Sequence, residues 1–248
     1  MSSPRKNPIL VVAFCSLAAL AAGAQPEERV VPVHQEPRHR LVFDSPGTRM
    51  LDVQIPPGDT TLFHTHSDPI PYVTMSTSQT RSQNLGAEWS GTAATAPPAA
   101  VEPAAARVIP SNPPGRMFGV TSYGDKPQTH RVNNVGSSLY RLIATTNSSP
   151  GDPSTEPSAD FAAKPELDNR WFRGYRWTLT AEPTDEHRHA NPVSIVLVNG
   201  AASAVVAEVK SPLQKPGDFV FIEANRPHRL VGTVAEAQVV EIEVRRPR

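Results

Sequence analysis

The chain has 248 residues, which corresponds to one or two domains at roughly 150 residues per domain. Its 24 Lys and Arg residues balance its 24 Asp and Glu residues, so it lacks the basic excess with which nucleic-acid-binding proteins hold phosphates. Its 27 prolines are roughly twice the ordinary usage and argue against a helical bundle, because proline breaks helix interiors. We therefore expect a fold built from strands and no nucleic-acid partner.

The first 24 residues have the three-part pattern of a secretory signal peptide. A short positively charged start precedes an apolar run over residues 9–22, and Ala22-Gly23-Ala24 supplies small residues for cleavage. The apolar run is too short to span a bilayer as a helix, which takes about 20 residues; an uncleaved membrane anchor is the alternative. The pattern predicts a periplasmic or secreted protein with no stable membrane insertion after cleavage. The sole cysteine, Cys15, would leave with the signal, so no disulfide is expected.

After residue 25, apolar residues alternate in short runs bounded by Pro, Gly, Asn and Asp, without a long 3.6-residue periodicity. Many short strands with such turns are typical of a β-sandwich or a β-barrel. In the last run, Val240, Ile242 and Val244 lie on one face of the expected strand. The sequence predicts strands over residues 51–55, 61–66, 72–76, 117–121, 139–145, 171–180, 194–198, 204–209, 218–222 and 238–244.

Residues 146–169 are rich in Ser, Pro, Asp and Glu, a composition that indicates an interdomain linker. The strand runs before and after it are then separate modules. The sequence therefore predicts four segments: a signal peptide over 1–24, an N-terminal module over 25–145, the linker over 146–169 and a C-terminal module over 170–248.

Six of the eight histidines form two matching sets, each an H-x-H pair followed by a single later His. Because residues i and i+2 of a strand point to the same face, each pair aims two imidazoles into one space. A third His from a later strand completes a three-nitrogen face, which leaves coordination positions open for water or substrate. The alternative is a set of hydrogen-bonded histidines inside a barrel. The metal ligands predicted in this way are His64, His66, His130, His187, His189 and His228.

The residues around these two sets resemble the sequence motifs of the cupin superfamily. Those motifs read G-x5-H-x-H-x3/4-E-x6-G and G-x5-P-x-G-x2-H-x3-N. The first half keeps Gly58, its His pair, and His130 with Asn134. The second half keeps its His pair, Gly217 and His228. The resemblance covers nearly all of the chain after the signal, and it implies two tandem jelly-roll barrels with a His triad inside each.

Both halves depart from the family pattern where the carboxylate ligand is expected. Ile70 or Pro71 stands at that position in the first half, and Val193 or Ser194 in the second. A three-His site without a carboxylate favours Fe(II), Zn(II), Ni(II) or Cu(II) over the harder Mn(II). The pattern is therefore less similar to two-module oxalate decarboxylases than to the thiol and diketone dioxygenases of the superfamily.

The resemblance implies an exported bicupin that is a mononuclear metalloenzyme of the dioxygenase type, an oxidoreductase acting on a small organic molecule. Each active module would hold one transition metal ion, with Fe(II) favoured and Zn, Ni or Cu as the other candidates. Asp68 is the candidate catalytic acid–base group, and a turn residue before Pro69 is the alternative reading. Glu182 and Glu186 are further candidates because they precede the second His pair.

Two other functions stay open at this stage. One is a non-catalytic module that binds a small ligand or a metal, and the other is an interaction protein with degenerate pockets. Tyr72 and Phe63 are interpreted as barrel filling, and His34 and His39 are placed in a charged N-terminal arm without a role. Because cupins commonly pair through sheet edges, a homodimer is also considered.

Overall fold

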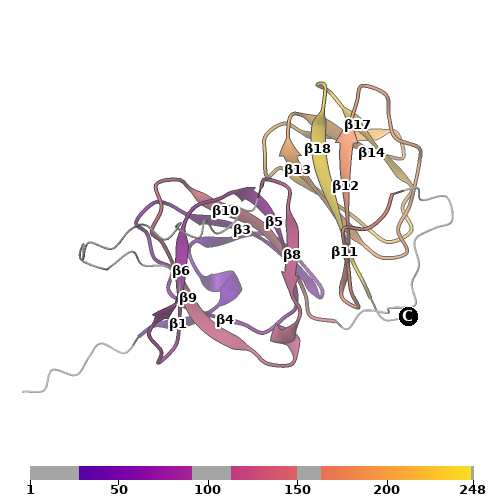
Figure 1. Ribbon diagram of the computed structural model, residues 1–248. Helices are drawn as coiled ribbons and strands as arrows, with labels where there is room; N and C mark the ends of the chain where they lie inside the picture. The colour runs from indigo at the N-terminus through magenta and orange to yellow at the C-terminus, as the bar shows by residue number, and fades with distance from the viewer. Residues whose placement is uncertain (1–27, 91–112, 150–162, 247–248) are drawn as a thin grey trace, which may run out of the picture.

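The computed structural model describes residues 28–90, 113–149 and 163–246 (Figure 1). The expected signal peptide and most of the expected linker lie outside these ranges. Within them, no helix is long and apolar enough to cross a membrane. The helical turns described are η1 (Val33–Gln35) and η2 (Ser122–Gly124), and nearly everything else that is regular is strand. The prediction of an all-β fold with two modules is confirmed.

The N-terminal module consists of two five-stranded sheets. The first has the order β1 (Val30–Pro32), β4 (Phe63–His66), β9 (Gln128–Asn134), β6 (Thr80–Asn84) and β7 (Trp89–Ser90). The second has the order β2 (His39–Ser45), β3 (Thr48–Ile55), β10 (Tyr140–Asn147), β5 (Ile70–Ser76) and β8 (Met117–Val120). In Figure 1 the sheets face each other, with β4 and β9 across from β3 and β10.

The C-terminal module has a five-stranded and a three-stranded sheet. The larger has the order β11 (Leu167–Asp168), β12 (Phe172–Leu179), β18 (Ala237–Val244), β13 (Val193–Asn199) and β16 (Phe219–Ile222). The smaller has the order β15 (Val209–Leu213), β14 (Ala202–Val206) and β17 (His228–Gly232). In each module the central strand of one five-stranded sheet, β10 or β18, comes last in that module's chain order.

Several element boundaries differ from those the sequence predicts. The strand expected over 204–209 is the end of β14 and the start of β15, because Ala207 and Glu208 adopt positive φ angles of 49° and 64° and turn the chain into a hairpin. The strands also extend into the expected linker. β10 continues through Asn147, and β11 begins at Leu167.

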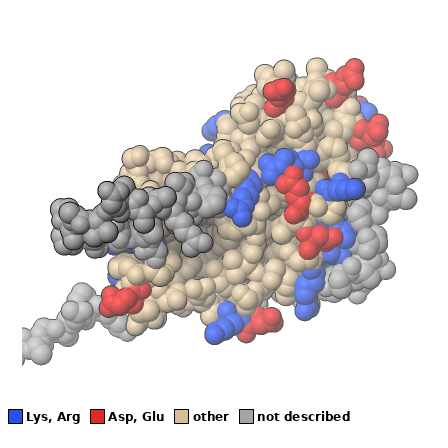
Figure 2. Space-filling view, viewed as in Figure 1, with Lys and Arg blue, Asp and Glu red and all other residues tan. Residues whose placement is uncertain are grey.

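The two modules pack against each other through the sheets that contain β10 and β18. Because side chains alternate across a strand, Val240, Ile242 and Val244 of β18 face the N-terminal module, where they pack in one buried cluster with Met50 and Ile143. Figure 2 shows positive and negative side chains close together near this junction, on the described part of the face in view. The opposite side chains of β10 and β18 must therefore point into the interiors of their own modules.

Candidate metal centres

Strands β4 and β9 bring three of the predicted histidines together in the N-terminal module. His64 and His66 project from the same side of β4, and antiparallel pairing places His130 of β9 directly opposite His64. The ring centroids of His64 and His66 lie 4.8 Å and 5.0 Å from that of His130, and 5.0 Å from each other. His64 and His66 are buried, and His130 is half-buried.

A fourth imidazole, which the sequence analysis left without a role, joins this cluster. His39 is buried at the start of β2, with its ring centroid 4.4 Å from that of His64 and 6.3 Å from that of His66. His39, His64 and His66 each offer a ring nitrogen within 4.8 Å of the others. Arg38 and Arg40 flank His39, so the local sequence is typical of an exposed charged segment. The inward direction of the His39 side chain is set by the tertiary structure.

Hydrogen bonds orient the imidazole nitrogens of the cluster. Nδ1 of His64 donates to the carbonyl of Leu62 at 2.9 Å, and Nδ1 of His39 donates to the carboxylate of Glu36 at 2.7 Å. In the neutral rings, Nε2 then carries the lone pair. Among the described residues, Nε2 of His64 and Nδ1 of His66 are buried and have no hydrogen-bond partner. Buried polar atoms without partners are rare, so these two nitrogens are candidates for binding a ligand.

Burial keeps His64, His66 and His130 uncharged. Desolvation, aided by the neighbouring histidines, lowers the pKa of His64 to about 2 and that of His66 to about 2. Desolvation and His39 lower the pKa of His130 to about 4. Neutral imidazole is the form that binds a transition metal, so this donor set fits the predicted ion.

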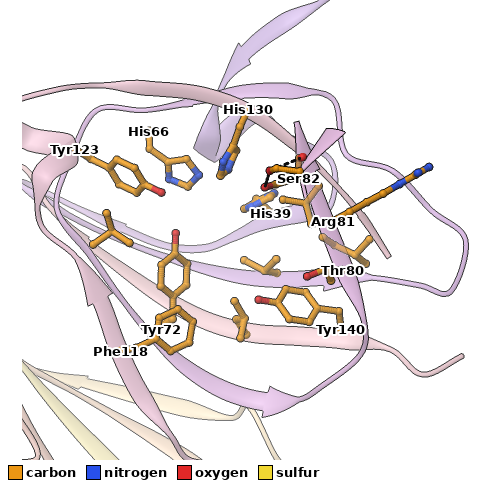
Figure 3. Close-up of a pocket in the computed structure, with 16 residues that line it drawn as sticks. His39, His66, Tyr72, Thr80, Arg81, Ser82, Phe118, Tyr123, His130 and Tyr140 are labelled. Atoms are coloured by element: carbon orange, nitrogen blue, oxygen red, sulfur yellow. Dashed lines mark hydrogen bonds between the residues drawn. The ribbon is translucent and has the colours of Figure 1, made fainter. Parts of the chain in front are cut away.

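A cavity of about 360 Å³ adjoins the N-terminal cluster. Its walls include His39, His66 and His130, and Figure 3 shows the hydroxyls of Tyr72 and Tyr123 pointing toward the same space. Most of the other walls are aliphatic or aromatic side chains. Tyr72 therefore lines a cavity, whereas we expected it to fill the barrel.

The charged groups around the cavity do not point into it. Arg81 contributes to the wall, but its guanidinium turns outward in Figure 3, donates from Nε to Asn133 at 3.0 Å and lies over the ring of Trp89. No Asp, Glu or Lys belongs to the described lining. The candidate acid–base residue Asp68 lies at a bend after β4, which ends at His66, and it belongs to neither cluster of possible metal ligands among the described residues.

The second His set also comes together, but with a different local structure. His187 lies outside the named strands and forms an isolated antiparallel bridge with His228, the first residue of β17. This bridge repeats the pairing of His64 with His130. The ring centroids of His187 and His228 are 4.3 Å apart, and that of His189 lies 5.6 Å and 5.5 Å from them.

Glu241 completes this C-terminal group, although no local sequence pattern indicates it. It comes from β18 and is fully buried, with Oε1 3.0 Å from Nε2 of His228 and 3.2 Å from Nε2 of His187. Its Oε2 lies 3.6 Å from Nε2 of His189. The candidates Glu182 and Glu186 are exposed and take no part. The carboxylate is therefore supplied from a distant strand, not from the segment next to the His pair.

The charges of the C-terminal group depend on one another. Burial alone would raise the pKa of Glu241, but the three imidazoles around it hold that pKa well below its usual range. Burial alone would lower the pKa of His189, but Glu241 and Glu243 raise it to about 9. Trp177 donates from Nε1 to Oε2 of Glu241 at 2.7 Å and fixes the carboxylate in place.

Solved structures with this architecture are similar in fold. AerE from Microcystis aeruginosa shares 9% identity, with a TM-score of 0.55 over 82% of this chain and 90% of that chain. Salicylate 1,2-dioxygenase from Pseudoaminobacter salicylatoxidans, solved with gentisate, shares 10% identity, with a TM-score of 0.51 over 81% of this chain and 69% of that chain. A cupin 2 conserved barrel domain protein from Leptotrichia buccalis has a TM-score of 0.47 at 10% identity, over 83% and 87% of the two chains.

The fold is cupin-like. At such low identity the likeness concerns the fold alone, because one fold carries many chemistries. No family model matches the sequence, and no curated protein matches it. The two His clusters therefore carry the evidence on function.

Proposed function

We propose that the protein is an exported metalloenzyme of the dioxygenase type, which acts on a small uncharged organic molecule in its N-terminal module. The observation that carries the proposal is a cluster of histidines beside a cavity, in which a buried nitrogen of His64 and one of His66 have no hydrogen-bond partner among the described residues. The export part rests on the signal-peptide pattern of the first 24 residues.

His39, His64 and His66 would hold the metal, with His130 beside them as the further nitrogen donor. An all-nitrogen set of imidazoles favours Fe(II), with Zn, Ni and Cu as alternatives. When bound, the metal would supply Lewis-acid and oxygen-activation chemistry through its open coordination positions. The chain's own part is to keep His64, His66 and His130 neutral by burial and to orient the ring nitrogens of the cluster.

The cavity lining supports an uncharged substrate. Burial raises the pKa values of Tyr72, Tyr123 and Tyr140, so their hydroxyls stay protonated and can donate hydrogen bonds to substrate oxygens. The apolar walls exclude water and hold a carbon skeleton. Gentisate, which the salicylate dioxygenase structure contains, carries a carboxylate. Here the guanidinium of Arg81 points away, so we expect carboxylates to bind poorly.

Oxygen consumption by the purified protein, reconstituted with Fe(II) without air, tests this function. Neutral phenols and diketones should support oxygen uptake, while salicylate should not. The double variant His64→Ala with His66→Ala should lose both the uptake and the N-terminal metal. Full metal content in this variant would contradict the assignment of the site.

A non-catalytic binding module is the second candidate. It is favoured by the lack of Asp, Glu or Lys in the described lining, which leaves no carboxylate or amine to move protons. Tight binding of a neutral phenol to the metal-loaded protein, without oxygen uptake for any compound, would support this reading over the enzyme.

A further inference from the structure

Three tyrosines line the N-terminal cavity, and their hydroxyls have no hydrogen-bond partner among the described residues. They are Tyr72, Tyr123 and Tyr140. The hydroxyls of Ser82 and Ser90, which line the same cavity, lie 3.2 Å apart and pair with each other. A hydroxyl that faces an apolar interior without a partner costs free energy. The three phenols are therefore the donors that a bound molecule is expected to engage.

Strand β10 places Tyr140 far from Tyr72 along the cavity. Alternate residues of β10 face the interior, and Ala144 of this row pairs with Tyr72 of β5. Tyr140 precedes Ala144 by four residues, which is about 13 Å of strand at roughly 3.3 Å per residue. Figure 3 shows Tyr72 and Tyr123 at one side of the cavity and Tyr140 at the other, with its hydroxyl turned toward the middle. The cavity therefore has phenol donors at two opposite ends.

Stacking holds the two hydroxyls of the first end in place. The ring of Tyr123 stacks on that of His66, with centroids 4.7 Å apart and planes at 21°. The ring of Tyr72 stacks on that of Phe118, with centroids 5.0 Å apart. Both hydroxyls point toward the same space beside His66 in Figure 3. One oxygen of a bound molecule can accept from both, and it then lies next to the His cluster.

The wall that joins the two ends along β10 is apolar. Val53 and Leu142 pair across β3 and β10, and both line the cavity. Val132 of β9 belongs to the wall as well. Aliphatic side chains offer no hydrogen bonds, so an oxygen placed against them would lose its water without compensation. The middle of a bound molecule is therefore expected to be a carbon skeleton.

Tyr140 has no counterpart in the C-terminal module. In the N-terminal module it pairs with Ile55 across β10 and β3, and both residues line the cavity. The corresponding pair across β18 and β12, Ala237 and Leu179, is buried in a packed aliphatic cluster. The second donor thus occurs only in the module with the open interior, which indicates a role in binding.

We propose that the N-terminal cavity takes an elongated, uncharged molecule with one oxygen function at each end of an apolar skeleton, and that Tyr140 selects for the oxygen at the second end. This inference rests on the proposed function, because it takes the cavity as the substrate site, and it narrows the substrate class. Tyr72 and Tyr123 hold the oxygen at the end beside His66. A site built to pair with a substrate oxygen discriminates against the analogue that lacks it. Tyr140 is thus a specificity-determining residue.

Paired ligands that differ in one oxygen test this selection. The alcohols are para-hydroxybenzyl alcohol and its homologues with one and two further methylenes, and each is matched with the para-alkylphenol of the same length. Calorimetric titration of the Zn(II)-loaded protein gives their affinities without oxygen chemistry. In wild type, at least one alcohol should bind about 5-fold tighter than its alkylphenol, the value of one net hydrogen bond. A cavity without a partner for that oxygen would favour the alkylphenol, and such a result, or equal affinities within every pair, would overturn the inference.

Three Tyr→Phe variants assign the preference to a residue. Tyr140→Phe should weaken the preferred alcohol about 5-fold and leave its alkylphenol unchanged. Tyr72→Phe removes a donor at the other end, so both members of the pair should weaken equally and the preference should remain. The control Tyr175→Phe removes a buried phenol hydroxyl of the C-terminal module and should match wild type. A preference that survives in Tyr140→Phe would contradict the role of this residue, and the wild-type comparison decides even where a variant fails to fold.

The outcomes separate this inference from the proposed function. If an alcohol binds tighter than its alkylphenol but the Fe(II)-loaded protein consumes no oxygen with any of these compounds, the dioxygenase proposal fails and the assignment of the two ends stands. If the phenols support oxygen uptake while affinities within every pair are equal, the dioxygenase proposal stands and the selection by Tyr140 fails.

Discussion

Nδ1 of His39 donates a hydrogen bond of 2.7 Å to Oε2 of Glu36, and both side chains are buried. Glu36 also accepts hydrogen bonds from the backbone N–H groups of Arg38 and Leu62, at 2.6 Å and 3.1 Å. Burial alone would raise the pKa of Glu36, but these contacts, with His39 foremost, lower it. The carboxylate thus ties β2 to the start of β4 and directs the other nitrogen of His39 into the cluster. Such outer carboxylates orient the histidines of metal sites.

Glu36→Gln should weaken metal binding at the N-terminal cluster by about 10- to 100-fold, because a neutral amide oxygen is a weaker acceptor for Nδ1–H of His39 than a carboxylate and orients the ring less firmly. Competition with a chromophoric chelator measures the affinity. Any metal bound at the C-terminal group serves as an internal control and should be held as tightly as in wild type. An unchanged N-terminal affinity would exclude His39 as a ligand.

The metal-free protein should become less stable as the pH falls. The folded-state pKa values of His64 and His66 are about 2, well below the unfolded value of about 6.5, because of burial. Below about pH 6.5 the unfolded chain therefore binds more protons than the folded chain does. The contribution of these two histidines to stability is complete above about pH 6.5 and is lost as the pH falls. Each of these two histidines lowers the free energy of unfolding by about 1.4 kcal/mol for every pH unit between about pH 6 and 4.

Urea unfolding at a series of pH values checks this slope. His64→Gln should reduce the slope of the unfolding free energy against pH by the amount that one histidine contributes. The variant should therefore lose less stability than wild type between neutral pH and about pH 4. Equal slopes for the two proteins would show that His64 is protonated in the folded state.

Trp177→Phe should destabilise the C-terminal module by about 1–3 kcal/mol, because it removes a charge-assisted hydrogen bond to a fully buried carboxylate. The Phe ring can still stack on His187, as Trp177 does with centroids 5.3 Å apart. Denaturant unfolding of the metal-free protein gives the free energy. A change below about 0.5 kcal/mol would mean that Glu241 finds another donor.

Binding to the cavity should depend on Tyr123 and not on Arg81. Tyr123→Phe removes a hydroxyl that points toward the cavity and should weaken binding of catechol about 5- to 10-fold, the value of one net hydrogen bond. Arg81→Ala should leave catechol affinity unchanged because the guanidinium is held outside by Asn133 and Trp89. Calorimetric titration of the Zn(II)-loaded protein measures both, with salicylate as the charged comparison. Tighter binding of salicylate than of catechol would contradict the uncharged cavity.

The sequence determined the elements of this protein. A period of two places Leu51, Val53 and Ile55 on one face of a strand, and H-x-H spacing places His64 and His66 on one face of another. These are local properties of the backbone and can be read residue by residue. The same alternation that sets Val240, Ile242 and Val244 on one side of β18 also sets Glu241 on the other.

Only the tertiary structure decided which faces meet. Glu241 reaches His187 across 54 residues of sequence, through sheet pairings that no local pattern specifies. His39 enters the other cluster for the same reason, because the pairing of β2 with β3 turns a charged-looking segment inward. The difference between a cavity beside Tyr140 and a packed core beside Ala237 depends on side-chain volumes summed over several strands. Contacts between distant strands are a property of packing, and packing is settled by the whole chain at once.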